Sequence, residues 1–179
     1  MGPVAEPPTH VIAIGASAGG LEALERFFDN VPARSGLAFV VVQHLSSDHK
    51  SMMGELLSRH TAMPVRTAHD GAAPEPDTVW LIPPGADLVM EGGVLRLLDR
   101  RPKPALHLPI DTFMESLASQ RGERCVAVVL SGTGSDGTRG LRAVKEAGGY
   151  VIVQTPSSAR FDGMPSSAVA TGLADLILP

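Results

Sequence analysis

The chain has one cysteine, no long apolar run and no excess of positive charge, and each absence excludes a class of protein. Cys125 is the only cysteine among the 179 residues, so an internal disulfide and a thiolate zinc cluster are both excluded. The formal net charge of -4 argues against a basic surface for nucleic acid. No apolar stretch approaches the roughly 18 residues of a membrane-spanning helix, and the N-terminus lacks a signal-peptide core. We therefore expect a soluble cytoplasmic domain that binds neither nucleic acid nor membrane.

The chain is rich in apolar residues and poor in charge. Hydrophobic residues make up 44% of it and charged residues 19%, which argues against disorder and against a coiled coil. A chain of 179 residues can bury a core of its own without disulfides. We expect one folded domain over residues 10–179, preceded by a disordered segment over residues 1–9.

Strand-like and helix-like patterns alternate along the chain. Apolar runs predict strands at "HVIAIG", "LAFVVVQ", "VWLIP", "CVAVVLSG", "YVIVQ" and "ADLIL". Helical periodicity lies between several of them, in "GGLEALERFFDNVP", "SMMGELLSRHT", "IDTFMESLASQRG" and "GTRGLRAVKEAGG". This order predicts an α/β fold, a three-layer α/β/α sandwich around a mostly parallel sheet. The segment "DLVMEGGVLRLLD" departs from the pattern and predicts an antiparallel hairpin at one edge of the sheet.

Three residues of catalytic type follow three of the predicted strands. Ser17 follows the first apolar run, His44 the second, and Asp136 lies in the loop after "CVAVVLSG". Because parallel strands end at the same edge of a sheet, the three side chains are expected on one rim. Serine, histidine and aspartate are the composition of a hydrolytic triad, so the pattern predicts nucleophilic catalysis.

Each of these residues also has a structural interpretation. Ser17 could cap the helix that follows it, and Asp136 could be a turn residue or a helix cap. The glycines around Ser17 satisfy the G-x-S-x-G elbow, whereas a dinucleotide-binding turn requires glycine at that position. A nucleotide-binding α/β domain is therefore the weaker alternative. The combination of all three residue types at three strand ends favours the triad.

The same residues carry a family resemblance. From Val11 to Pro179 the chain resembles the catalytic domain of the chemotaxis protein-glutamate methylesterases, in the blocks "IGASAGG", "VVVQH", "PID", "LSGTGSDGTRGLRAVKEAGG" and "DGMPSSAVATGLADLILP". The resemblance implies that Ser17 is the nucleophile, His44 the general base and Asp136 the triad acid. It implies removal of methyl groups from glutamate γ-methyl esters on the cytoplasmic helices of methyl-accepting chemoreceptors, with glutamine deamidation as a second activity. It implies no metal or organic cofactor.

The resemblance also assigns the surroundings of the nucleophile. It implies that backbone N–H groups of Ala18, Thr133 and Gly134 receive the oxyanion, and that Met164 lies beside Ser17 in the substrate cleft. Family members commonly have threonine where Ala18 stands and methionine where Thr133 stands. These departures keep open a catalytically weak, regulatory homologue that binds a receptor-like helix. The loop "GTGSDG" resembles the variant in fusion proteins, which adds methyltransferase and sensory domains of a larger protein as candidate partners.

Asp111, in "LPIDTFM", is the rival of Asp136 for the triad acid. Asp111 begins a predicted helix, where an aspartate usually caps free N–H groups. Asp136 stands past an apolar strand in a glycine-rich loop, which can bend its carboxylate toward His44. We therefore favour Asp136 as the triad acid, and we expect Asp111 to cap its helix.

Overall fold

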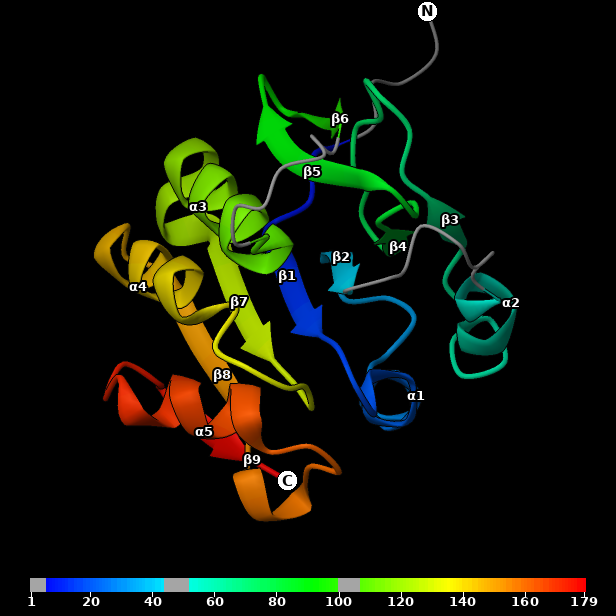
Figure 1. The fold of residues 1–179 in the computed structure, drawn as a ribbon. Helices are drawn as coiled ribbons and strands as arrows, with labels where there is room; N and C mark the ends of the chain where they lie inside the picture. The colour runs from blue at the N-terminus through cyan, green and yellow to red at the C-terminus, as the bar shows by residue number, and fades with distance from the viewer. Residues whose placement is uncertain (1–5, 44–51, 100–106) are drawn as a thin grey trace, which may run out of the picture.

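A seven-stranded parallel sheet runs through the centre of the computed structural model, which describes residues 6–43, 52–99 and 107–179 (Figure 1). The strand order is β3-β4-β2-β1-β7-β8-β9, and every ladder between neighbours is parallel. The strands are β1 (Val11–Ala16), β2 (Ala38–Gln43), β3 (Val65–Thr67), β4 (Thr78–Leu81), β7 (Cys125–Val129), β8 (Tyr150–Gln154) and β9 (Leu176–Leu178). All six apolar runs form strands of this sheet. The apolar pattern did not predict β3, which is short and partly exposed at the edge.

Helices cover both faces of the sheet, so the predicted three-layer α/β/α sandwich is confirmed. One face carries α3 (Pro109–Arg121), α4 (Thr138–Glu146) and α5 (Gly163–Ala170), and the other carries α1 (Gly20–Asp29) and α2 (Met53–Leu57). Single 3-10 turns occupy Gly122–Arg124 and Pro156–Ser158. The sequence analysis did not predict α5. Among the described residues, no helix combines the length and the apolar character needed to cross a bilayer.

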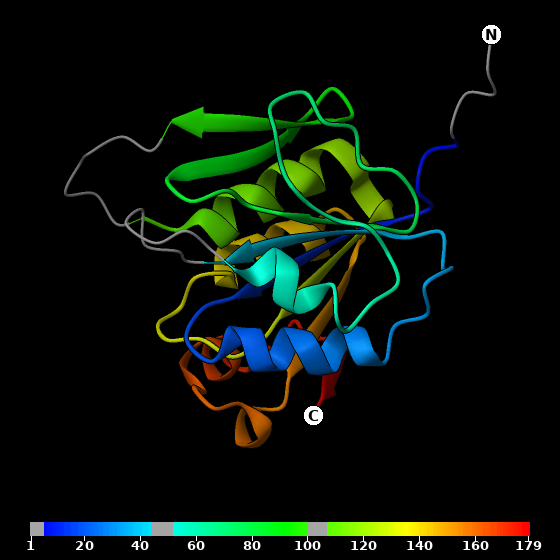
Figure 2. The same cartoon turned by 90° about the vertical axis from the view of Figure 1, so that its right-hand side faces the viewer.

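The predicted antiparallel hairpin is present, as β5 (Ala86–Glu91) and β6 (Val94–Asp99). It forms a two-stranded sheet of its own and is not hydrogen-bonded to the edge of the main sheet. Figure 2 shows it as an additional layer above α3, with the main sheet and then α1 below. Leu88 and Leu95 are fully buried in the cluster that contains Phe113 of α3. The hairpin therefore lies over α3 because that helix covers its apolar side.

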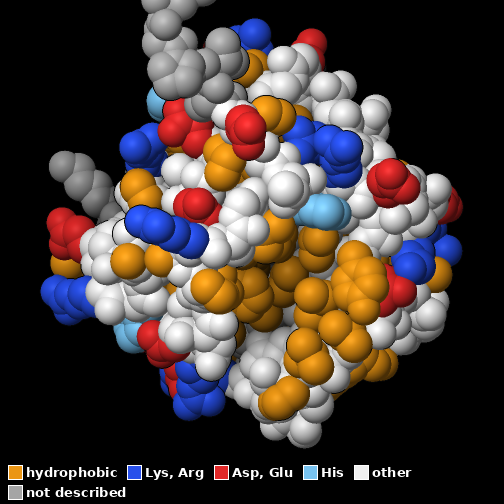
Figure 3. All heavy atoms as spheres, turned by 180° about the vertical axis from the view of Figure 1, so that it is seen from behind, with side chains coloured by type: hydrophobic (Ala, Val, Ile, Leu, Met, Phe, Trp, Pro, Cys, Tyr) orange, Lys and Arg blue, Asp and Glu red, His pale blue; other side chains and the backbone are white. Residues whose placement is uncertain are grey.

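The second face of the main sheet is only partly covered within the described residues. The register aligns Tyr150 with Val126 and Ile152 with Leu176, so these side chains share the face on which α1 packs. Tyr150 and Leu176 remain 44% and 40% exposed. Seen from behind, apolar side chains gather in a hollow at the centre of the molecule (Figure 3).

Helices α3 and α4 approach each other closely at Gly140. A Cβ added at Gly140 would lie 2.6 Å from Met114 Cβ and 3.2 Å from Asp111 Cα. Both contacts are shorter than van der Waals separation, and the second involves backbone that cannot rotate away. A glycine at this position therefore sets the distance between the two helices.

We expect Gly140→Ala to destabilise the protein by roughly 1–3 kcal/mol, because overpacking outweighs the better helix propensity of alanine. The matched control is Gly54→Ala in α2, where an added Cβ would make an ordinary 3.7 Å contact with Leu81. Thermal unfolding followed by circular dichroism measures both variants. A melting temperature for Gly140→Ala equal to that of Gly54→Ala would show that the helices can separate at no cost.

Candidate active site

Ser17 lies in the turn between β1 and α1, and neighbouring strands hold the turn from both sides. Its N–H donates to the carbonyl of Ser131 at 3.0 Å, and its own carbonyl accepts from Gly20 N at 2.9 Å. The side-chain amide of Gln43, at the end of β2, donates to the same carbonyl at 3.4 Å. Gly19 adopts a left-handed conformation with φ of 71°, which glycine allows without strain. The turn therefore presents the partly exposed Ser17 at the carboxyl end of the sheet.

The hydroxyl of Ser17 faces the loop after β7. The backbone N–H of Thr133 donates to Ser17 Oγ at 3.1 Å, and Met164 Sδ lies 3.5 Å from the same oxygen. Gly132 lies directly beneath them, and any Cβ there would overlap both Ser17 Oγ and Met164 Sδ. A side chain at position 132 would therefore displace Ser17 Oγ and Met164 Sδ, a constraint that the sequence pattern did not reveal. The structure thus places Thr133 and Met164 beside Ser17, with Met164 fully buried and not among the residues that line the cavity at Ser17.

Two of the predicted oxyanion donors have no competing acceptor. Among the described residues, no hydrogen-bond acceptor is recorded for the N–H of Ala18 or of Gly134. Gly134 has a φ of 82°, and its carbonyl accepts from Ser167 Oγ at 3.3 Å. These N–H groups can therefore donate to an oxygen that develops negative charge near Ser17.

Ser131 connects the turn of Ser17 to the segment before α5. Its hydroxyl donates to the carbonyl of Ala18 at 2.8 Å and accepts from Phe161 N at 3.0 Å. The N–H of Gly132 donates to the Phe161 carbonyl at 3.0 Å, and Met164 N donates to the Gly132 carbonyl at 2.8 Å. Ser131 is only 1% exposed, so its hydroxyl is structural and its bonds fix Met164 beside Ser17.

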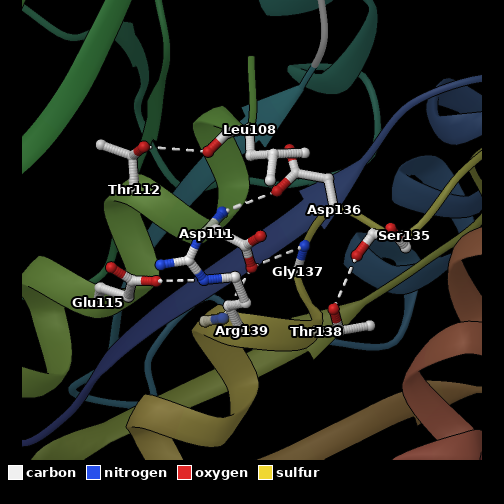
Figure 4. A network of polar contacts seen from close by, with 10 residues as sticks. Leu108, Asp111, Thr112, Glu115, Ser135, Asp136, Gly137, Thr138 and Arg139 are labelled. Atoms are coloured by element: carbon white, nitrogen blue, oxygen red, sulfur yellow. Dashed lines mark hydrogen bonds and ion pairs between the residues drawn. The ribbon is translucent and has the colours of Figure 1, made fainter. Parts of the chain in front are cut away.

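Asp136 and Asp111 form a reciprocal pair of helix caps, which we call the carboxylate latch (Figure 4). The Asp136 carboxylate accepts from Ile110 N at 3.1 Å and from Asp111 N at 2.9 Å, both in the first turn of α3. Asp111 Oδ1 accepts from Gly137 N at 3.0 Å and from Gly140 N at 2.7 Å, at the start of α4. The expectation that Asp111 caps its own helix is therefore wrong. Each carboxylate caps the helix that begins beside the other residue.

The environment of Asp111 disfavours its charged form. Asp111 is 3% exposed, and its Oδ2 has no hydrogen-bond partner among the described residues. Burial raises the pKa of the carboxyl from 3.8 to about 6, and the negative charge of Asp136 adds to this shift against the opposing N–H bonds from Gly140 and Gly137. Asp111 therefore gains and loses its proton at mildly acidic pH.

His44, the predicted general base, lies outside the described residues. Its place between Ser17 and Asp136 therefore rests on the sequence pattern. Within the described part of the chain, no group of three or more His, Cys, Asp or Glu side chains is placed to hold a metal ion.

Comparison with known proteins finds one family. Residues 12–179 match the family model described as CheB methylesterase. The crystal structure of the Thermotoga maritima CheB methylesterase catalytic domain superposes with a TM-score of 0.85 at 30% identity, covering 95% of this chain and 92% of that one.

Longer proteins are similar in sequence. A protein-glutamate methylesterase/protein-glutamine glutaminase of Geobacillus kaustophilus is 36% identical over 98% of this chain and 52% of its own length. One from Xanthomonas campestris is 39% identical over 94% of this chain and 48% of its own length. An uncharacterized 104.1 kDa protein of Rhodobacter capsulatus is 57% identical over 70% of this chain and 13% of its own length. The chain thus spans about half, or less, of these relatives.

The raised pKa of Asp111 predicts a dependence of stability on pH. Because the folded state favours the protonated carboxyl, Asp111 contributes to the free energy of unfolding. This contribution is complete below pH 3.8 and is lost as the pH rises through about 6. Asp111→Asn removes the titration and keeps one oxygen for the N–H groups of α4. Relative to wild type, we expect the variant to gain up to about 3 kcal/mol in free energy of unfolding between pH 4 and pH 7.

Urea unfolding of both proteins at pH 4, 5, 6 and 7 measures this difference. Asp70→Asn, at a carboxylate that is 58% exposed, is the control for a generic loss of negative charge. A difference between wild type and Asp111→Asn that stays constant over this range would show that Asp111 ionises at its ordinary pKa.

Proposed function

The chain belongs to the CheB methylesterase family, and we propose that it is a serine hydrolase that demethylates glutamate γ-methyl esters of chemoreceptors. Deamidation of glutamine side chains is the second activity of the proposal, in keeping with the names of the Geobacillus and Xanthomonas relatives. The observation that carries it is the geometry around Ser17. A serine hydroxyl at a strand end accepts a bond from Thr133 N–H, and the N–H groups of the adjoining residues Ala18 and Gly134 have no acceptor among the described residues.

Ser17 acts as the nucleophile in this proposal. His44 takes the hydroxyl proton, and Ser17 Oγ forms a bond to the ester carbonyl carbon. The negative charge on the carbonyl oxygen is received by the N–H groups of Ala18, Thr133 and Gly134. His44 returns the proton to the methoxy group, which leaves as methanol. Water, activated by His44, then cleaves the acyl-enzyme to a carboxylate and restores Ser17.

Asp136 orients His44 and stabilises its protonated form. Both Asp136 oxygens already accept a backbone N–H from α3, and a carboxylate oxygen can accept more than one hydrogen bond. The same bonds fix the carboxylate against rotation. Asp136 therefore combines a capping role with the role of triad acid, and neither excludes the other.

The proposed setting is the cytoplasm, where the cytoplasmic helices of chemoreceptors supply the substrate. In the Rhodobacter capsulatus relative the matched region is 13% of the protein, so a similar region occurs within a much larger chain. Methyltransferase or sensory domains of a larger protein are the neighbours that we propose. The proposal requires no metal or organic cofactor, because proton transfer and covalent catalysis use the side chains alone.

We expect Ser17→Ala to abolish labelling by a fluorophosphonate probe and to lower kcat for methanol release by about 10⁴-fold or more. The fold is retained, because the backbone bonds of the turn do not involve the hydroxyl. Mass spectrometry locates the label, and a methyl-esterified receptor peptide is the substrate. Ser157→Ala, at an exposed serine, is the matched control. Labelling at another serine, such as Ser131, would overturn the assignment.

Asparagine variants separate the two candidate triad acids, since alanine would remove caps from α3 or α4 in either case. We expect Asp136→Asn to lower kcat by roughly 10⁴-fold, because the amide favours the wrong tautomer of His44. It should also lose roughly 1–3 kcal/mol of stability, because one N–H of α3 loses its acceptor.

Asp111→Asn is the comparison and should keep most of its activity. Methanol release and urea unfolding, measured on the same preparations, distinguish lost chemistry from lost folding. If Asp111→Asn is the inactive variant and Asp136→Asn turns over normally, Asp111 is the triad acid.

A further inference from the structure

Arg160 lies on the rim of the cavity that contains the nucleophile. This cavity, of about 510 Å³, is lined by Ser17 and the first turns of α1 on one side and by Arg160 on the other. Arg160 is exposed, and it comes from the segment between β8 and α5. A cation thus shares an open cavity with the hydroxyl that is proposed to attack the ester.

The position of Arg160 is fixed by its neighbours. The backbone of Phe161 is bonded to Ser131 and Gly132, which themselves hold the turn of Ser17. A Cβ built on Gly19 would lie 3.1 Å from Arg160 Cβ, so the stem of the arginine packs against the nucleophile turn. The Arg160 guanidinium lies 5.9 Å from the centre of the Phe161 ring, within the range of a cation–π contact. These contacts hold the charged group near the cavity.

The two glutamates that line the cavity already contact side chains other than Arg160. Glu22 pairs with Arg26 at 3.1 Å, and Glu25 contacts His60 at 3.1 Å. Among the described residues, no carboxylate forms an ion pair with Arg160. The guanidinium is therefore available to an anionic group that enters the cavity with the substrate.

We propose that Arg160 is a specificity-determining residue, which binds a carboxylate of the substrate protein next to the methyl-esterified glutamate. This inference rests on the proposed esterase function. Although the chain carries a net charge of -4, Arg160 supplies a local positive charge at the cavity of Ser17, which attracts a carboxylate there. Because the contact is made to a neighbouring residue and not to the reacting ester, it strengthens binding and leaves the chemical step unchanged.

Two helical peptides test the proposal, each with a single glutamate γ-methyl ester. One carries glutamate at the positions three and four residues before and after the ester, and the other carries glutamine there. At low ionic strength we expect wild type to favour the acidic peptide by roughly fivefold in kcat/KM, through KM, as for an exposed ion pair. The preference should disappear in 0.5 M NaCl, where the Debye length falls to roughly 4 Å.

Arg160→Gln should remove the preference and Arg160→Glu should invert it, while kcat for the neutral peptide stays unchanged. Arg160→Lys should restore part of the preference, which confirms that charge is responsible. Arg142→Gln, at an exposed arginine of α4 that lines a different hollow, is the matched control and should behave as wild type.

The outcomes distinguish a failure of the proposed role of Arg160 from a failure of the proposed esterase function. If wild type and Arg160→Gln release methanol from both peptides in the same ratio, the role of Arg160 is wrong and the esterase function stands. If wild type releases no methanol from either peptide, the esterase function fails and the role of Arg160 fails with it.

Discussion

The carboxylate latch between Asp111 and Asp136 is the constraint on which the rest of the site depends. It ties the first turn of α3 to the first turn of α4 through four backbone N–H groups. Two carboxylates so close together repel each other, and burial adds to the cost of charging Asp111. The N–H bonds offset part of this cost. The arrangement needs the close helix approach that Gly140 permits, because Gly140 N is itself one of the four donors.

The latch fixes only one end of the loop that follows β7. At its other end, Ser131 and Gly132 are bonded to the turn of Ser17 and to Phe161. Held at both ends, the loop directs the N–H of Thr133 at Ser17 Oγ without a side chain of its own being required. The nucleophile turn, the loop after β7 and the segment before α5 thus form one network. Such pre-organisation is what electrostatic stabilisation of an oxyanion requires.

The sequence predicted the layers better than the contacts between them. Parallel strands are commonly continuous apolar runs, so six of the seven strands were visible, including the exposed but wholly apolar β9, whereas the short β3, "VRT", has no apolar run. The glycine pair at the tip of the hairpin predicted its pairing, since Gly92 and Gly93 both have positive φ. Local pattern does not tell which surface a hairpin packs on, and this one lies over α3 and not at the sheet edge.

The same limit applies within the site. The strand-end rule placed Ser17 at the edge where parallel strands end, and the family resemblance placed Thr133 and Met164 beside it. The crossed caps of Asp111 and Asp136 were not predicted, since capping rules are local and these residues bond across 25 positions of sequence. The need for glycine at position 132 is likewise a property of the packed site. His44 remains a prediction of the sequence.

At Ala18 and Thr133 this chain differs from the threonine and methionine that are common in the family. Neither difference removes a side chain of the proposed triad. The proposed contribution of both positions is a backbone N–H group, and bonds of Ser131 and the latch hold the backbone on either side of them. Replacing the side chain at either position leaves those determinants in place. What changes is the surface that the substrate meets around the ester. Arg160, in the segment before α5, lines the cavity at Ser17, whereas Met164 of α5 is fully buried beneath Ser17 Oγ. In our proposal, selectivity for the substrate therefore depends on exposed side chains such as Arg160, while the chemical step depends on backbone N–H groups.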